Sequence, residues 1–205
     1  TSPANDAGVV SPGGLATVKG ANLAAGTVVG TVADGKWPES LGGVELHLVD
    51  GVGRNVTTGL LYVSGGQINF QIPNGVADGW KTLELKDASG VRQVGKVRVQ
   101  RGTAGIFQNG GMPMVDEGRI NADGTVTPIP AAIPLSGPVQ VSFYLTGFEG
   151  TVADTWAVVG GKRVSPVAAG SVPGVPGLQR VTIRVDQGAV TVADLLLFTR
   201  GKQIR

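Results

Sequence analysis

A strand unit that occurs twice constrains this chain more than any other feature. The first copy is Leu60–Pro73, LLYVSGGQINFQIP, and a degenerate second copy is Gly170–Val185, GSVPGVPGLQRVTIRV. Each copy has a Gly/Pro-rich approach, a glutamine, and then apolar residues at every second position. This period of two is typical of a strand with one buried face and one face in water. A duplicated β unit predicts two β domains.

The alternation also assigns residues to faces. The core-facing positions are predicted to be Ile68, Phe70, Ile72, Val181, Ile183 and Val185. The outward positions of the first copy carry three amides, which could pair with another polar strand or with a glycan, or could simply face solvent. These candidate ligand-binding residues are Gln67, Asn69 and Gln71.

The composition supports many short strands around an ordinary core. The 205 residues include 34 glycines and 12 prolines, yet 41% are hydrophobic and only 16% are charged. The glycines lie in clusters between apolar runs, as tight turns require, and no segment shows a helical period. We predict an all-β fold of two tandem immunoglobulin-like β-sandwich domains. The expected boundaries are 1–104 for the first domain and 105–205 for a connector and the second domain.

Charge and residue usage narrow the function classes. The formal net charge is +2, with no dense Lys/Arg cluster, so no nucleic-acid partner is expected. The sequence contains no run of about 18 apolar residues, so insertion into a membrane is not predicted. The chain has no cysteine, which excludes disulfides and thiolate chemistry. We expect neither a cofactor nor a metal.

The motifs, taken in order, resemble a known family. SPGGLATVKGANLA, ESLGGVELHL, LLYVSGGQINFQIP and AGIF are similar to the uncharacterised C-terminal repeat domain of acidobacterial secreted proteins. Tyr144–Gly147 and Ala169–Val185 are similar to its second half. The resemblance implies tandem immunoglobulin-like (IPT/TIG-like) domains on exported proteins, without any known activity. The chain departs from the family pattern at Gly65, which replaces a proline, and at Arg180, which replaces a valine.

Few side chains suggest catalysis or metal binding. His47 is the only histidine, and it shares a predicted strand face with Glu45. Ser64 lies in a glycine-rich turn without a nucleophile motif, and most acidic residues lie in turns. Two alternatives stay open: a calcium site at Asp116, Glu117 and Asp123, and an isopeptide bond between Lys19 and Asn69. No catalytic residue is predicted.

Two tryptophans are candidates for sugar binding. Trp80 shares the outer face of its predicted strand with Thr82 and Glu84, and Trp37 precedes a proline in a loop. An exposed flat aromatic ring can stack on a sugar ring while polar neighbours form hydrogen bonds. Alternatively, Trp80 covers a strand edge and Trp37 closes one end of the sandwich.

The last predicted strand, Val190–Phe198, is almost continuously apolar. Buried on both sides it would be a central strand, whereas on an edge it would pair with another chain. The candidate assembly residues are Leu195, Leu196, Leu197 and Phe198.

The sequence as a whole favours a non-enzymatic, secreted or cell-surface bacterial module for adhesion, spacing or assembly. Its expected partner is a protein or a glycan at the cell surface. A carbohydrate-binding module and a self-associating subunit of an extracellular filament are the alternatives.

Overall fold

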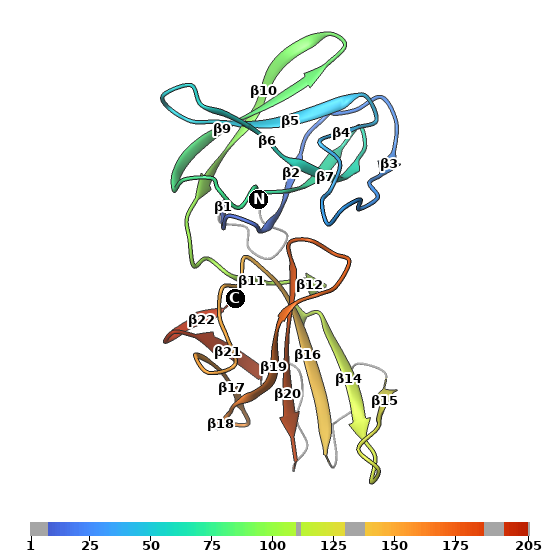
Figure 1. Cartoon of the computed structure of the whole chain (residues 1–205), viewed down its shortest axis with the longest axis vertical. Helices are drawn as coiled ribbons and strands as arrows, with labels where there is room; N and C mark the ends of the chain where they lie inside the picture. The colour runs from blue at the N-terminus through green and yellow to red at the C-terminus, as the bar shows by residue number, and fades with distance from the viewer. Residues whose placement is uncertain (1–7, 110–111, 130–137, 187–194, 205) are drawn as a thin grey trace.

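The protein folds into two β-sandwiches that lie end to end (Figure 1). The structure, a computed structural model, describes residues 8–109, 112–129, 138–186 and 195–204. None of these residues is helical, so the prediction of an all-β fold with two tandem immunoglobulin-like sandwiches is confirmed. None of the described segments, accordingly, forms a helix with the length and apolarity that crossing a bilayer requires.

The first domain has two sheets that face each other across a core. One sheet has the order β1-β10-β9-β5-β4, with β6 also paired to β5, and the other has the order β2-β8-β7-β3. The strands of the first sheet are β1 (Val9–Val10), β10 (Gly90–Val99), β9 (Gly79–Asp87), β5 (Val44–Val49), β4 (Ser40–Leu41) and β6 (Asn55–Thr57). Those of the second are β2 (Leu15–Lys19), β8 (Gln67–Gln71), β7 (Gly59–Val63) and β3 (Val28–Val29).

The second domain is also built from two main sheets. Their orders are β15-β14-β16-β20-β19, with β11 paired to β16, and β18-β17-β21-β22. The strands of the larger sheet are β15 (Val126–Ile129), β14 (Val115–Ile120), β16 (Val139–Thr146), β20 (Leu178–Val185), β19 (Pro166–Ser171) and β11 (Gly105–Ile106). The smaller sheet has β18 (Lys162–Val164), β17 (Thr155–Val159), β21 (Leu195–Thr199) and β22 (Lys202–Ile204), and β12 (Gln108–Asn109) pairs with β13 (Met112–Pro113).

The two copies of the repeated unit occupy equivalent places. Strand β8 lies between β2 and β7, and β20 lies between β16 and β19. The facing sheets match as well, because β6-β5-β9-β10 corresponds to β18-β17-β21-β22. Each hairpin partner carries a register shift, at Leu60/Tyr62 in β7 and at Pro166/Ala168 in β19. The sequence repeat therefore reflects a repeat of topology.

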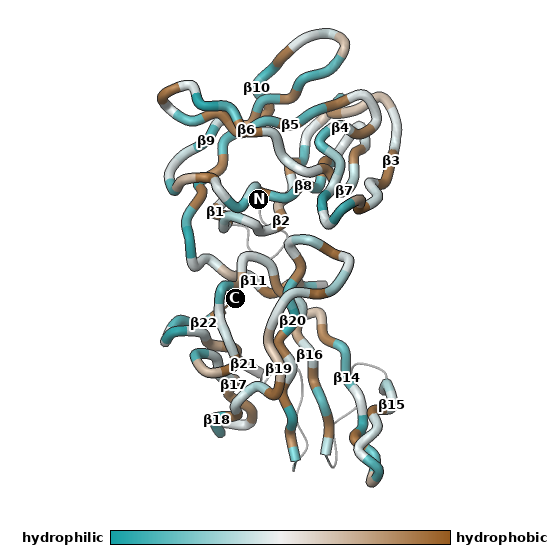
Figure 2. Tube along the Cα trace, viewed as in Figure 1, coloured by the Kyte–Doolittle hydropathy of each residue, from teal (hydrophilic) through white to brown (hydrophobic). Residues whose placement is uncertain are grey.

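Each domain has its own hydrophobic core. One cluster of buried residues extends from Val10 to Val99 and the other from Ile106 to Ile204. The expected core residues of both repeat copies are buried, including Phe70 and Ile183. Hydrophobic and hydrophilic segments alternate along the long strands of both domains (Figure 2). Burial of this alternating apolar face is the main stabilising contribution in each sandwich.

The predicted assembly strand is an inner strand. Its described part, β21, pairs with β17 on one side and with β22 on the other, while residues 190–194 lie outside the described residues. Leu197 is fully buried, and the Phe198 ring stacks on Trp156. The short strand β22 covers that edge of β21 over Leu197–Thr199, and assembly through Leu195, Leu196, Leu197 and Phe198 stays a prediction.

The turn-rich connector contributes strand β14, which carries a buried carboxyl group. Glu117 lies opposite Val141 of β16 and is only 6% exposed. Its Oε2 atom has no hydrogen-bond partner. Burial raises the pKa of Glu117 above its ordinary value of 4.5, because removal from water disfavours the charged form.

We predict that Glu117→Gln stabilises the protein at neutral pH, by about 1 kcal/mol, since it removes an unpaired buried charge. In the wild type, the folded state binds the Glu117 proton more tightly than the unfolded state. Its contribution is therefore present below the unfolded pKa and is lost as pH rises through the folded pKa. Urea unfolding between about pH 4 and pH 8 measures the free energy of unfolding across this range. The variant should lack the loss of stability that Glu117 causes as the pH rises.

The exposed Glu39→Gln is the control for the same change in net charge. Equal unfolding midpoints for wild type and Glu117→Gln at neutral pH would contradict the prediction.

Candidate functional site

The joint between the two domains brings together motifs that lie far apart in the sequence. The loop Ser11–Gly14, just before β2, meets the end of β16 and the loop between β19 and β20 (Figure 1). The segment from Gln100 to Ala104 connects β10 to β11. Because this connection is short and β11 is paired to β16, the two sandwiches are held close together.

Hydrogen bonds cross the joint at two places. The backbone N–H of Leu15 donates to Thr146 Oγ1, and the Thr146 hydroxyl donates to the carbonyl oxygen of Gly177 at 3.1 Å. The indole Nε1 of Trp37 donates to the carbonyl oxygen of Pro176 at 2.9 Å. Thr146 is only 3% exposed, so water competes little for its hydroxyl. Such sheltered hydrogen bonds are costly to lose, because each unpaired group would stay buried.

Two glycines allow the close approach of the domains. A Cβ atom on Gly147 would lie 2.6 Å from Ser11 Cβ and 2.9 Å from the carbonyl oxygen of Thr103. A Cβ atom on Gly177 would lie 2.7 Å from Leu15 Cδ2. Both glycines have positive φ, +66° and +87°, which other residues rarely adopt. Only glycine fits at these positions.

The first repeat copy anchors the joint loop to its own domain. The N–H of Gly13 donates to Ile72 O at 2.9 Å, and the N–H of Ile72 donates to Gly14 O at 2.8 Å. The side chain of Gln71 donates from Nε2 to Gly13 O at 3.0 Å. The end of strand β8 therefore fixes the loop that contacts the second domain.

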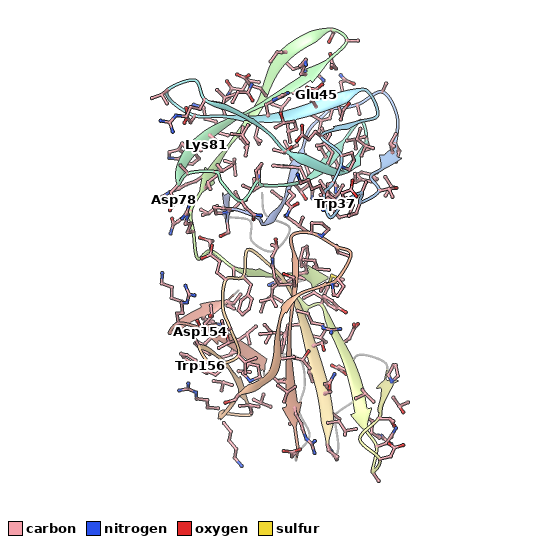
Figure 3. All side chains as sticks on the ribbon, viewed as in Figure 1. Trp37, Glu45, Asp78, Lys81, Asp154 and Trp156 are labelled. Carbon is pink, nitrogen blue, oxygen red and sulfur yellow. The ribbon has the colours of Figure 1, made fainter. Side chains whose placement is uncertain are left out.

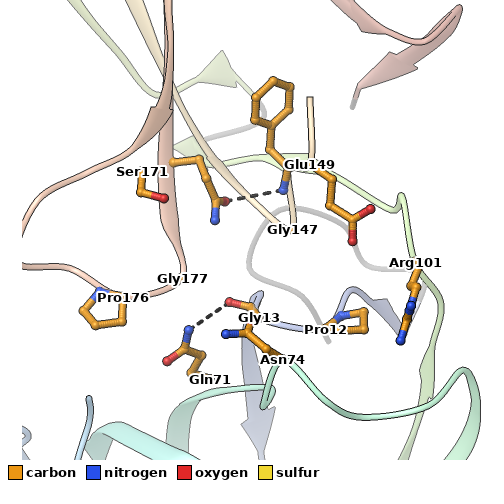
Figure 4. A pocket seen from close by; sticks show the side chains of 12 residues that line it. Pro12, Gly13, Gln71, Asn74, Arg101, Gly147, Glu149, Ser171, Pro176 and Gly177 are labelled. Carbon is orange, nitrogen blue, oxygen red and sulfur yellow. Dashed lines mark hydrogen bonds between the residues drawn. The ribbon is translucent and has the colours of Figure 1, made fainter. Parts of the chain in front are cut away.

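A polar cleft of about 460 Å³ opens beside these contacts (Figure 4). Both domains line it, and its polar side chains include Gln71, Asn74, Arg101, Glu149 and Gln179. Gln71 donates to Gly13, and Gln179 Oε1 accepts the backbone N–H of Phe148 at 3.4 Å. These two amides therefore already support the walls of the cleft.

Trp80 lies away from this cleft lining, on the outer face of a sheet. It is 64% exposed and is the only aromatic residue of the described chain that is exposed to this extent. Its cross-strand neighbour is Arg98 of β10. The expectation that Trp80 shares the outer face of β9 with Thr82 and Glu84 agrees with the burial pattern of this strand.

A shallow recess of about 440 Å³ adjoins the Trp80 ring. Its lining combines the aromatic ring with two lysines, one carboxylate and small residues: Val49, Asp50, Gly51, Trp80, Lys81, Thr82 and Lys96. The turn that closes it is held by Asp50, whose Oδ1 accepts the backbone N–H groups of Val52 and Arg54. Hence the recess has a fixed wall and an open mouth.

The other predicted ligand-binding residues have structural partners. Trp37 is half-buried and its indole N–H is used in the joint, on the other side of the first domain from Lys81 (Figure 3). Asn69 Oδ1 accepts hydrogen bonds from Thr17 and from Gln67, and Gln71 is bonded to Gly13. The amides therefore tie strands and loops of their own domain together.

The third tryptophan, Trp156, is covered on both ring faces. Phe198 stacks on one face, with ring centroids 5.6 Å apart. The guanidinium of Arg163 lies 4.1 Å from the Trp156 ring centroid. The sequence reasoning gave this residue no role, and the structure places it in a packed stack on the second domain.

The candidate reactive residues are engaged in local contacts. His47 Nε2 lies 3.1 Å from Glu45 Oε2, and its Nδ1 lies 2.9 Å from Asn55 Oδ1. Hydrogen bonds from Lys86 and then His47 lower the pKa of Glu45. The Ser64 hydroxyl bonds to the backbone of Gln67 and so closes the predicted turn.

The acidic residues of the connector do not meet in one place. Asp123 accepts hydrogen bonds from Thr125, and Asp116 accepts one from the Tyr144 hydroxyl. Within the described part of the chain, no group of three or more His, Cys, Asp or Glu side chains could hold a metal ion. Lys19 lies opposite Gln67 and Thr17 lies opposite Asn69, so β-pairing does not place Lys19 against Asn69.

Comparisons with known proteins give little further guidance. No protein-family model matches the chain, and no curated protein matches it. Among solved structures, the chain is similar to SGBP-B of the mixed-linkage glucan utilization locus of Bacteroides ovatus, in complex with a mixed-linkage heptasaccharide. The identity is 17%, the match covers 96% of this chain and 40% of that chain, and the TM-score is 0.43. The chain thus spans well under half of that protein, and a likeness at this level carries no functional argument.

Proposed function

We propose that the chain is a non-enzymatic, exported bacterial module that holds two sandwiches in a fixed relative orientation for spacing or adhesion. The observation that carries this proposal is the joint. Two cross-domain hydrogen bonds, two glycine contacts and a five-residue connection from Gln100 to Ala104 act on the same interface. A module that keeps two domains in a fixed relative orientation needs a joint of this kind, since freely linked domains reorient by default.

The roles of the reactive side chains support a non-catalytic function. His47, Ser64 and the turn carboxylates each hold a strand or a turn in place. A general base or nucleophile instead needs a partner arranged toward a substrate position. These contacts are of the kind that stabilises a scaffold.

Carbohydrate binding at Trp80 is a second candidate function. The specific observation is one freely exposed indole ring beside a recess lined by polar and charged side chains. Sugar rings stack through their apolar faces on such a ring and form hydrogen bonds at their edges. The rigid joint and the Trp80 surface are compatible, because no described residue that lines the recess takes part in the joint contacts.

We predict that Gly147→Ala loosens the joint. Alanine would need a strained positive φ, at a cost of about 1–2 kcal/mol, and its Cβ would collide with Ser11. Since the chain has no cysteine, spin labels can be placed on Cys introduced at the exposed Val91 and Val167. The distance distribution between the labels should be narrow in the parent and broad in the variant.

The matched control is Gly160→Ala. Gly160, in the β17–β18 turn, also has positive φ, +54°, but a Cβ atom added to it would meet nothing within 4 Å. This variant should keep the narrow distribution. An equally broad distribution in the parent protein would refute the proposal of a fixed orientation.

We predict that Trp80→Ala weakens binding to any saccharide that the first domain recognises by at least about tenfold, or 1.4 kcal/mol. The unfolding midpoint should hardly change, because the Trp80 side chain is mostly exposed. A glycan array followed by titration calorimetry measures the effect. The control Trp156→Ala removes a covered ring and should leave binding intact, so loss of binding in both variants, or in neither, argues against this site.

A further inference from the structure

We propose that the Trp80 surface binds an acidic saccharide, one whose sugar rings carry uronic-acid carboxylates. This inference rests on the carbohydrate-binding candidate described above and names the ligand class of that site. Two exposed cationic side chains on the same outer face as the ring carry it: Lys96 and Arg98.

These cations lack carboxylate partners. Lys96 lies opposite Thr82 on β10, and Arg98 lies opposite Trp80. Among the residues that the structure describes, neither they nor Lys81 have a carboxylate oxygen within 4.0 Å. The outer face around Trp80 therefore carries two cations, Lys96 and Arg98, that have no ion-paired carboxylate within the described ranges.

The far end of the same sheet is different. There Lys86 pairs with Glu45 at 3.1 Å, and Arg92 pairs with Asp87. The cations at the far end of these strands thus form ion pairs with carboxylates, whereas those beside Trp80 form none with the described carboxylates. This division along the same strands points to an anionic ligand at one end.

Lys81 lies on the core-facing side of β9, together with Leu83 and Leu85. It is only 7% exposed, and it lines both the Trp80 recess and a smaller cavity of about 90 Å³ behind it. The carboxylate that acts on it electrostatically is Asp50, whose Oδ1 already accepts two backbone N–H groups. The cations that a ligand on the outer face can reach are therefore Lys96 and Arg98, whereas Lys81 extends from the other face of β9.

A uronic acid fits both features of the site. Its ring has an apolar face that can stack on the Trp80 indole, and its carboxylate can accept charge-assisted hydrogen bonds from lysine or arginine. A neutral sugar would use the ring but leave the cations unmatched. The acidic sugar therefore uses more of the surface.

A single-stranded nucleic acid would also bring anions to an aromatic ring. Such ligands, however, usually stack successive bases on several aromatic side chains. Trp80 is the one exposed aromatic residue in the described chain. A single stacking platform favours the saccharide, and an oligonucleotide serves as a competing probe.

The test is titration calorimetry of the full chain with galacturonate, mannuronate and glucuronate-containing oligosaccharides. Each is compared with its carboxyl-reduced, neutral form, and a single-stranded oligonucleotide is included. At least one acidic sugar should bind about tenfold more tightly than its reduced form, as expected for one charge-assisted hydrogen bond. Raising the salt concentration should weaken only the acidic sugar.

Variants locate the effect. Lys96→Met and Arg98→Met should each lower affinity for the acidic sugar several-fold without changing that for the reduced form, whereas Trp80→Ala should weaken both. Lys86→Met, at the paired end of the sheet, is the control and should change neither. Lys96 and Arg98 are both exposed, so neither variant should prevent folding.

The contrary outcomes are distinct. Equal binding of acidic and reduced sugars overturns the inference and leaves carbohydrate binding at Trp80 standing. Absence of saccharide binding overturns both, while leaving the fixed joint untouched. Tighter binding of the oligonucleotide than of every acidic sugar overturns the inference in favour of a nucleic-acid ligand.

Discussion

The buried hydroxyl of Thr146 is the contact on which the relative position of the two domains depends. It accepts the backbone N–H of Leu15 and donates to Gly177, and so links strand β2 of one sandwich to the end of β16 and the β19–β20 loop of the other. This geometry is available only because Gly147 and Gly177 leave room for it. A larger residue at either position would separate the backbones before the hydrogen bonds could form.

The fixed joint gives the exposed face of the first domain a defined direction. Trp80, Lys96 and Arg98 lie on the outer face of the sheet β10-β9-β5, and all three are exposed. A ligand bound there would be presented at a constant angle to the second sandwich. Under the proposed function, spacing and recognition would be two roles of one rigid body, in which each domain has its own core.

The side chains that alternate between the two faces of one strand could be assigned to a face from the sequence. Phe70 and Ile183 face the cores, and Trp80 faces outward, because a period of two fixes the face of a side chain. The inner position of β21 could not be predicted, since its covering strand β22 has three residues and only Ile204 is apolar and buried. So short a polar strand gives no periodic signal.

The joint and the cationic surface could not be predicted from the sequence, for a different reason. The Ser11–Gly14 loop, Gly147 and Gly177 were visible as motifs, but their contacts join segments more than one hundred residues apart, and glycine carries no side-chain pattern that names a partner. Lys96 and Arg98 become neighbours of Trp80 only through the β9–β10 register, which is shifted between Gln93 and Gly95.

Nuclear magnetic resonance of the unmodified protein in an aligning medium tests the central claim most directly. Residual dipolar couplings report the orientation of each domain independently. If the joint is fixed, couplings from both sandwiches fit one alignment tensor with the domain arrangement of Figure 1. Two tensors of clearly different magnitude would show that the domains reorient independently, and the account of a rigid joint would be wrong.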